Sequence, residues 1–213
     1  MDAGNRRSYP GSGTTWTDLS GNGINGTLTN GPTFTSENGG AVVFDGVDDQ
    51  VVGQTYTLNI SEKTLGGWVR LTTLPQGGGG IINHQISSGF VFDGIVYNET
   101  SNGWGFGSEA YNRTGWSGVF ETSTSAWVNM VATYQNLNYR MYRNGILIYT
   151  LTSFNTYNYT TTSNFTMGLR HTSASMFSPY LIGNIAQASF YNRALTAAEV
   201  RQNFNATRGR YGI

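Results

Sequence analysis

Turn-forming residues recur along the whole of this 213-residue chain, and the runs between them are short and rich in β-branched and aromatic residues. Gly and Asn supply turns, while Val, Ile, Thr, Tyr and Phe fit a pleated, half-buried surface. Turn signals at intervals of roughly 8 to 15 residues are typical of an all-β sandwich or barrel. The clearest runs span 41–45, 49–53, 64–71, 80–86, 90–97, 126–135, 139–152, 165–171 and 181–192. No linker divides them, so the pattern predicts a single all-β domain over residues 1–213.

Two local signals predict a hairpin and a helix. Asn144-Gly145 lies between two β-prone runs, and a type I′ hairpin turn needs a positive φ at both central residues. Thr196 is followed three residues later by Glu199, which is the capping-box pattern of a helix start. The chain therefore predicts one short helix near its C-terminus.

Three carboxylates stand close together in the stretch VVFDGVDDQVV, at Asp45, Asp48 and Asp49. The flanking runs are apolar and β-prone, and Asp-Gly suits a tight reversal in which the aspartates accept backbone N–H groups. We therefore expect the tip of a hairpin. Clustered carboxylates also suit a hard cation, which is the alternative reading, and a catalytic pair is the least favoured.

Composition excludes several classes of function. Charged residues make up 11% of the chain, with 12 basic and 12 acidic side chains, so no basic stripe is present to bind nucleic acid. Cysteine is absent, which excludes thiol catalysis, disulfides and Cys-ligated zinc. No apolar run approaches 18 residues, so we expect no insertion into a membrane.

Six motifs in order resemble the laminin-G-like, concanavalin A-like lectin/glucanase domain. They are WTDLSGNGINGTLTNGPTF, GGAVVFDGVDDQVV, LGGWVRL, AWVNMVATYQ, YRNGILI and GNIAQASFYNRALTAAEVRQNF. The resemblance covers about Trp16 to Phe204 and implies a two-sheet antiparallel jelly-roll sandwich with one short C-terminal helix. It implies that Phe44 anchors the core and that Trp68 and Trp127 pack between the sheets.

The two ends of the chain resemble lectin-like domains in structural proteins of tailed phages. The residues that carry this are DAGNRRSYPGSGTTWTDLSGNG and NFNATRGRYGI. The resemblance implies a domain excised from a longer virion protein, or a small protein displayed on a particle. It places the domain at the virion surface or outside the cell, with glycans, and other virion proteins, as partners.

Two departures from the family pattern bear on metal binding and catalysis. Relatives carry an acidic residue in the last strand that helps to bind calcium, and here Ala186 replaces it. We therefore expect no cofactor, with Asp18 as the one remaining candidate calcium ligand, because Ca²⁺ needs six to eight oxygens. Glucanases of this fold carry Glu-x-Asp-x-x-Glu on one strand, and no such set occurs on a predicted strand. We expect no enzyme; His84 and His171 stand alone in strand-like runs and add no catalytic pattern.

Aromatic residues between 102 and 118 form the candidate ligand site. Sugar rings stack their C–H faces on aromatic rings, while their hydroxyls need polar partners. The predicted carbohydrate-binding residues are Trp104, Tyr111, Arg113 and Trp116, with Asp93 and Tyr97 as secondary candidates. The alternative for both tryptophans is a place in the sandwich core.

The leading hypothesis is a non-catalytic carbohydrate-binding module of a phage particle that adheres to host-surface glycans. The alternatives are a virion structural or decoration domain that binds protein, and a glucanase-type hydrolase, which the missing carboxylate set disfavours.

Overall fold

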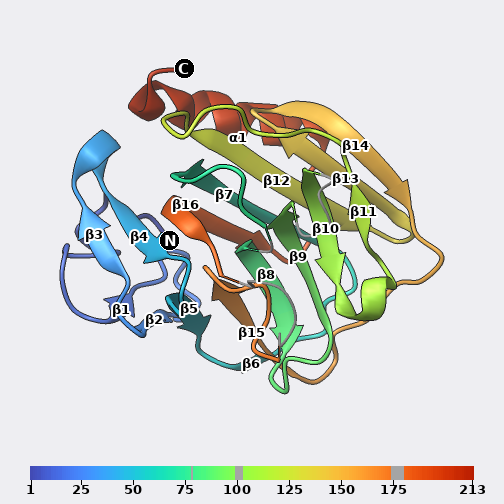
Figure 1. The fold of residues 1–213 in the computed structure, drawn as a ribbon. Coiled ribbons are helices and arrows are strands. Elements are labelled where there is room, and N and C mark those ends of the chain that lie inside the picture. The colour runs from blue at the N-terminus through green and yellow to red at the C-terminus, as the bar shows by residue number, and fades with distance from the viewer. Residues whose placement is uncertain (78, 99–102, 174–179) are drawn as a thin grey trace.

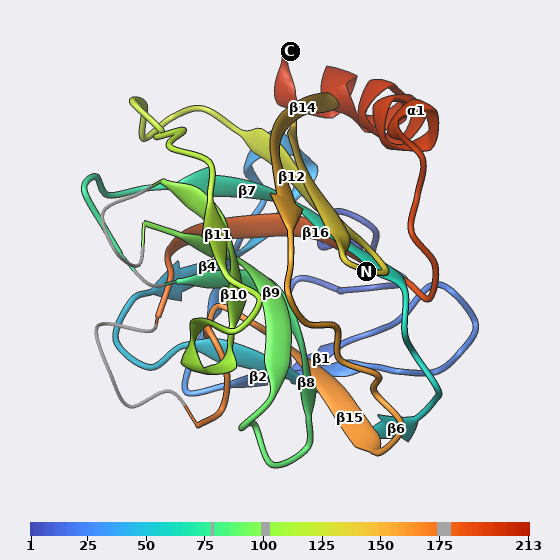
Figure 2. The same cartoon turned by 90° about the vertical axis from the view of Figure 1, so that its right-hand side faces the viewer.

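The computed structural model describes residues 1–77, 79–98, 103–173 and 180–213. Its strands form two antiparallel sheets stacked face to face (Figures 1 and 2). Within the described residues, the nine-stranded sheet has the order β1 (Thr15–Trp16), β2 (Gly26–Thr29), β5 (Gln50–Gly53), β15 (Thr162–Met167), β8 (Gly80–Ile86), β9 (Phe92–Tyr97), β10 (Trp104–Ser108) and β11 (Gly115–Trp116), and β6 (Tyr56–Thr57) also pairs with β15. The predicted jelly-roll sandwich is confirmed.

The second sheet has seven strands. Its order is β14 (Ile146–Thr152), β13 (Asn138–Arg143), β12 (Val128–Gln135), β7 (Lys63–Leu71), β16 (Ile182–Tyr191), β4 (Ala41–Asp45) and β3 (Thr33–Thr35). The helix α1 (Ala197–Thr207) lies along the outside of this sheet, followed by the 3₁₀ turn η3 (Arg208–Tyr211). Two more 3₁₀ turns, η1 (Glu37–Gly39) and η2 (Glu109–Tyr111), occur in loops. Among the described residues, no helix has the length and apolar character needed to cross a membrane.

The main core lies between the sheets and follows the alternation of the strands. On β7, Leu65, Val69 and Leu71 point into it, and they meet Ile95 and Phe106 from the opposite sheet. Phe44 belongs to this core as predicted, with 1% of its surface exposed. Burial of such side chains contributes about 1.5–3 kcal/mol each to folding.

Trp68 and Trp127 were expected between the sheets, and that expectation is wrong. Because neighbours in a strand point to opposite faces, Trp68 lies on the outer side of β7, away from Val69. Its ring stacks on Tyr211 at 4.0 Å, and Trp127 packs on Tyr211 at 5.1 Å. The two tryptophans therefore hold η3 and α1 against the outer face of the seven-stranded sheet.

The acidic stretch 45–49 does not form a hairpin, contrary to expectation. β4 pairs with β16 and β3 in one sheet, whereas β5 pairs with β2 and β15 in the other, so the turn crosses between sheets. Asp45 accepts the N–H of Val47 at 2.8 Å, and Asp49 accepts the N–H of Asp45 at 3.0 Å. Gly46 has φ +80° and packs against Ile182, where a Cβ would collide. The turn chemistry was predicted, but the partner of each strand was not.

The other two local predictions are confirmed. Asn144 and Gly145 have φ values of 52° and 74° and join β13 to β14. Thr196 and Glu199 form the capping box at the start of α1, with each side chain bonded to the other's backbone N–H.

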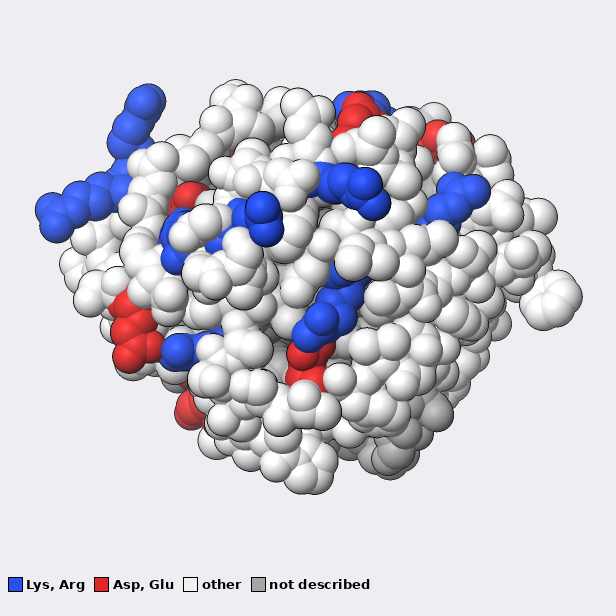
Figure 3. Space-filling view, turned by 90° about the horizontal axis from the view of Figure 1, so that it is seen from above, with Lys and Arg blue, Asp and Glu red and all other residues white. Residues whose placement is uncertain are grey.

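Charged side chains are sparse on the face that carries α1, where Figure 3 shows small separate groups among largely uncharged residues.

Candidate functional site

The stretch that holds most of the predicted ligand residues forms two strands at one edge of the nine-stranded sheet. β10 pairs with β9 on one side and with β11 on the other, and η2 lies between β10 and β11. Alternation along β10 turns Trp104 and Phe106 inward and leaves Gly105 and Gly107 on the outer face. This outer face therefore has no side chains of its own along β10, which makes room for rings from neighbouring segments.

Trp104 is a core residue and not a ligand-facing one, which decides between the two alternatives that the sequence left open. It is fully buried, and its indole Nε1 donates a hydrogen bond of 2.6 Å to Glu121 Oε1. Tyr97 packs beside it at 4.7 Å, and the Tyr97 hydroxyl accepts the N–H of Glu121 at 3.0 Å. Neither ring presents a face to solvent.

Trp116 lies on the outer face and is half-buried. It pairs with Gly105 across the β10–β11 ladder, and a Cβ added at Gly105 would collide with the indole ring. The ring therefore covers the bare backbone of β10, and any larger residue at 105 would displace it. Val96 stands opposite Gly105 on β9 and continues the same face.

Further aromatic groups extend this face toward η2. Phe92 and Val96 both flank the position where a Cβ on Gly107 would sit, so they share the outer side. The Arg170 guanidinium lies 5.1 Å from the Phe92 ring and 5.8 Å from the Tyr111 ring, and 45% of Tyr111 is exposed. His171 stacks on Phe92 at 4.4 Å. We call Phe92, Val96, Tyr111, Trp116, Arg170 and His171 the outer-face cluster.

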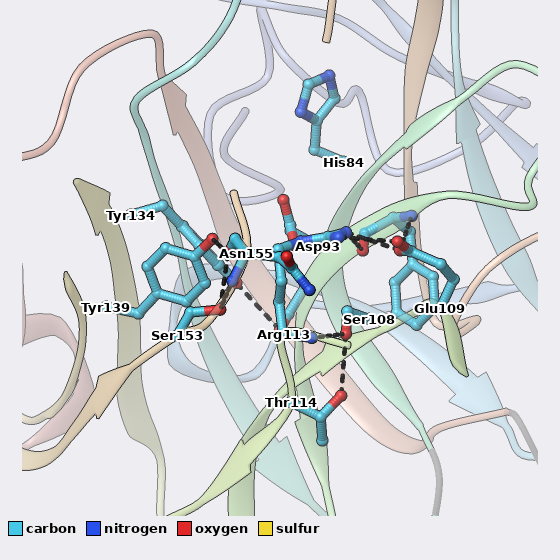
Figure 4. Close-up of polar contacts among 12 residues, drawn as sticks. His84, Asp93, Ser108, Glu109, Arg113, Thr114, Tyr134, Tyr139, Ser153 and Asn155 are labelled. Atoms are coloured by element: carbon cyan, nitrogen blue, oxygen red, sulfur yellow. Dashed lines mark hydrogen bonds and ion pairs between the residues drawn. The ribbon is translucent and has the colours of Figure 1, made fainter. Parts of the chain in front are cut away.

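Asp93 and Arg113 belong to a buried charge cluster inside the sandwich (Figure 4). Asp93 accepts a hydrogen bond of 2.7 Å from Lys63 Nζ and one of 2.8 Å from Arg113 Nε. Arg113 also binds both carboxylate oxygens of Glu109, at 2.7 and 2.6 Å. The Tyr159 hydroxyl donates to Asp93 at 3.0 Å. The side chains of Lys63, Asp93 and Arg113 are each at most 2% exposed, so they do not face an outside ligand.

The buried acid and bases of this cluster stay charged because each offsets the effect of burial on the other. Burial alone would raise the pKa of Asp93, but the Lys63 ammonium and the Arg113 guanidinium outweigh it and hold that pKa below its ordinary value. Burial lowers the pKa of Lys63, and Asp93 opposes this effect. The Lys63 ammonium also lies 4.2 Å from the Tyr159 ring and 4.9 Å from the Tyr134 ring. The cluster ties β7 to β9 across the core.

His84 lies beside this cluster (Figure 4), with its ring centroid 4.0 Å from that of Tyr159 and tilted by 34°. Both of its ring nitrogens are buried and have no hydrogen-bond partner among the described residues. Burial, with the nearby Lys63 ammonium, holds its pKa well below 6.5. The unfolded chain therefore binds a proton that the folded chain excludes, and stability falls as the pH drops below about 6.5.

We expect the free energy of unfolding to fall between about pH 7 and pH 5, by up to roughly 1.4 kcal/mol per pH unit for each excluded proton. Burial and Arg170 lower the pKa of His171 to about 4, so this residue adds to the same slope. Urea unfolding at several pH values measures it. The variant His84→Phe keeps a ring in place and should flatten the slope. An unchanged slope in that variant would contradict the assignment.

Three of the carboxylates considered for a metal ion, those of Asp18, Asp45 and Asp49, accept hydrogen bonds from the protein. Both Asp18 oxygens accept hydrogen bonds from Ser20, at 2.9 Å from its N–H and 2.6 Å from its hydroxyl. Asp45, Asp48 and Asp49 bring ligand atoms within 4.8 Å of one another, but Asp45 and Asp49 hold the turn. Ala186 is fully buried beside Trp68. Asp18 and Ala186 do not fit a calcium site of the family type.

A sequence profile described as the Concanavalin A-like lectin/glucanases superfamily matches residues 44–201. The chain belongs to this superfamily. No curated protein matches the sequence. Among solved structures, domain 4 of AbnA, a GH43 extracellular arabinanase from Geobacillus stearothermophilus in complex with arabinotriose, has a TM-score of 0.73 and 17% identity, over 87% of this chain and 91% of that one.

In two other solved structures, this chain matches only part of a longer chain. Trypanosoma rangeli sialidase aligns at a TM-score of 0.66 and 17% identity over 93% of this chain but 32% of its own. The binding domain of Paraclostridial Mosquitocidal Protein 1 gives 0.66 and 17% over 89% of this chain and 49% of its own. At these identities the likeness shows the concanavalin A-like fold.

Proposed function

We propose that this concanavalin A-like chain is a non-catalytic carbohydrate-binding module and that the surface members of the outer-face cluster, Trp116 and Tyr111, contact the sugar, while Phe92 and Val96 are fully buried. The observation that carries the proposal is the half-buried Trp116 ring, which is seated on the bare backbone of Gly105. An aromatic ring held in this way stacks on the C–H face of a sugar with little loss of side-chain freedom. Tyr111 and Arg170 supply polar groups at the side of the cluster.

The character of the ligand follows from the charges. The chain has equal numbers of acidic and basic residues, and the acids near the cluster, Asp93 and Glu109, are bound to Arg113. A neutral glycan fits this balance better than an anionic one. The AbnA domain with bound arabinotriose supports the proposal by its similar fold.

The absence of catalysis is part of the proposal. Glycoside hydrolysis needs two carboxyl groups that flank the bond, one of them protonated near neutral pH. Asp93 instead has a lowered pKa and is enclosed by Lys63 and Arg113. Glu109 is held by two hydrogen bonds from Arg113.

The setting that we propose is adhesion of a phage particle to host-surface glycans, on the strength of the sequence resemblance of residues 2–23 and 203–213. The second candidate is a virion structural domain that binds protein. Ile146 and Leu147 favour it, because they are 63% and 48% exposed on β14, the edge strand of the seven-stranded sheet. Exposed apolar groups on an edge strand suit a protein partner.

A glycan array with the purified protein tests the proposed function. We expect selective binding in the wild type and a loss of roughly five- to ten-fold in Trp116→Ala, because a stacked ring contributes about 1–1.5 kcal/mol. Tyr111→Ala should weaken binding less, since its ring lies at the side of the cluster.

The matched control is Phe154→Ala, which removes a ring that is 96% exposed elsewhere on the surface. It should bind as the wild type does. If no glycan binds to the folded protein, the sugar-binding proposal fails and the protein-binding alternative gains. If Phe154→Ala and Trp116→Ala weaken binding equally, the outer-face cluster is not the site.

A further inference from the structure

A cleft opens at the side of the sandwich opposite the β10–β11 edge, where the loop 18–25, β6 and the end of β16 meet. It consists of two adjoining cavities of ≈ 230 and ≈ 1130 Å³. Both are lined by Ser20, Asn22, Ile24, Tyr56, Phe190 and Tyr191. The cleft lies apart from the outer-face cluster, which contributes none of the described lining residues.

The cleft exists because the partner strand of β15 is interrupted. β5 pairs with Thr166 and Met167, and β6 pairs with Thr162 and Ser163, so the intervening Asn164 and Phe165 have no ladder partner on that side among the described residues. The link between β5 and β6 passes through Gln54 and Thr55, both of which line the larger cavity. Ile82, Phe165 and Met167 form an apolar floor between the sheets.

Three half-buried aromatic rings, Tyr56, Phe190 and Tyr191, form the walls. The Tyr56 ring stacks on His84 at 5.8 Å and 13°, and Phe190 packs on His84 at 5.1 Å. The Tyr56 and Phe190 rings are therefore fixed before any ligand arrives, which lowers the entropy cost of binding.

The polar groups of the cleft are almost all uncharged. The Tyr56 hydroxyl and Asn164 Oδ1 are buried and have no hydrogen-bond partner in the described part of the chain. Buried polar atoms are rarely left unpaired in proteins, so the Tyr56 hydroxyl, whose residue lines both cavities, marks a place for an outside partner. The neutral side chains at the rim are Ser20, Asn22, Gln54, Thr55, Thr57 and Asn192. Asp18 is the one charged side chain among the described lining residues, and Ser20 binds both of its oxygens.

We propose that this cleft is a second binding site, which takes a single neutral sugar ring or the terminal residue of a glycan. The apolar face of the ring packs on Tyr56 and Phe190, and its hydroxyls bond to the Tyr56 hydroxyl and to the amide and hydroxyl groups of the rim. Aromatic walls with one nearby carboxylate would also suit a quaternary ammonium ion. The many amide and hydroxyl groups at the rim favour the sugar, because each can accept from or donate to a ring hydroxyl.

The test is a titration of the ¹⁵N-labelled full chain with methyl glycosides of glucose, galactose, N-acetylglucosamine and arabinose, followed by amide shifts. We expect at least one glycoside to shift residues 18–24, 53–58 and 189–192. Tyr56→Phe should bind it roughly ten-fold more weakly, through loss of one hydrogen bond. The same variant should not lower the melting temperature, because the hydroxyl has no partner in the protein. Asn22→Trp, which fills the mouth of the cleft from an exposed position, should abolish binding.

Two controls separate this site from the outer-face cluster. Tyr149→Phe removes a hydroxyl elsewhere, on β14, and Trp116→Ala alters the outer face; neither should change the cleft titration. Choline chloride serves as the competing probe. Binding of choline without any glycoside would overturn the sugar assignment. Absence of shifts with every probe, or full binding in Asn22→Trp with a native spectrum, would overturn the site. Because the glycan array depends on Trp116 and this titration does not, either proposal can fail alone.

Discussion

Replacement of Asp93 by Asn is expected to destabilise the fold by about 3–5 kcal/mol, because it leaves the buried Lys63 without its counter-charge and removes one of the two carboxylates that bind Arg113. Lys63 and Arg113 both bind this carboxylate, and their side chains are 1% and 2% exposed. Asn keeps the shape of Asp but removes the charge. The loss of stability therefore measures how much the carboxylate compensates the buried cations, and not a change in packing. With a marginal net stability of about 5–15 kcal/mol for a typical domain, such a loss is a large fraction of the total.

Urea unfolding followed by tryptophan fluorescence measures this effect. The matched control is Glu37→Gln, which breaks the ion pair with Arg70 where the Glu37 side chain is 61% exposed, and should cost less than about 1 kcal/mol. A second variant, Lys63→Met with Asp93→Leu, removes one cation together with the carboxylate. An Asp93→Asn cost as small as the Glu37→Gln cost would show that the cluster is not held by charge compensation.

The second large effect is expected from Trp104→Ala, which should also cost about 3–5 kcal/mol. The substitution removes a fully buried indole and leaves Glu121 without the hydrogen bond from Nε1. Glu121 remains paired with Arg143, so its charge stays compensated and the loss reports mainly the cavity.

Trp116→Ala is the matched comparison, because it removes the same side chain from a half-buried position on the outer face. It should cost clearly less stability than Trp104→Ala, while it is the variant expected to lose glycan binding. Thermal and urea unfolding of both proteins provide the measurement. Equal stability losses would place Trp116 in the core and remove the basis of the proposed platform.

The longer strands and the helix were largely predictable because their signals are local. The run 41–45 is β4, the run 80–86 is β8, and the capping box marks the start of α1. β10 was missed, because its two outward positions are Gly105 and Gly107, so its apolar residues looked like a glycine-rich loop. The alternation typical of a strand was nonetheless present, because Trp104 and Phe106 are two positions apart with Gly105 between them.

Sheet membership could not be predicted from these local patterns. The runs on either side of the 45–49 turn have the same composition whether they pair with each other or with distant strands, and here the partners are distant. The side of Trp68 depends on which face of the seven-stranded sheet meets the core. Alternation places Trp68 and Val69 on opposite faces of the sheet. It does not predict which of these faces meets the core and which is covered by α1.

The candidate site was predictable only in part. Burial places Asp93, Tyr97, Trp104 and Arg113 inside the sandwich, whereas Tyr111 and Trp116 reach its surface. The carbohydrate-binding assignment of these last two stays a prediction. Phe92 and Val96 could have been inferred from alternation with Asp93. Arg170 and His171 could not, because they join the cluster from the segment after β15, far along the chain.

The position of β15 and β16 has a consequence for how the protein matures on the ribosome. β15 lies between β5 and β8, and β16 lies between β7 and β4, so the last strands to be synthesised occupy interior places in both sheets. Neither sheet can close while the chain is still short, and the early strands keep open edges until residue 191 has left the exit tunnel. Folding is thus a late, whole-chain event, and the exposed edges of the nascent protein need protection until then.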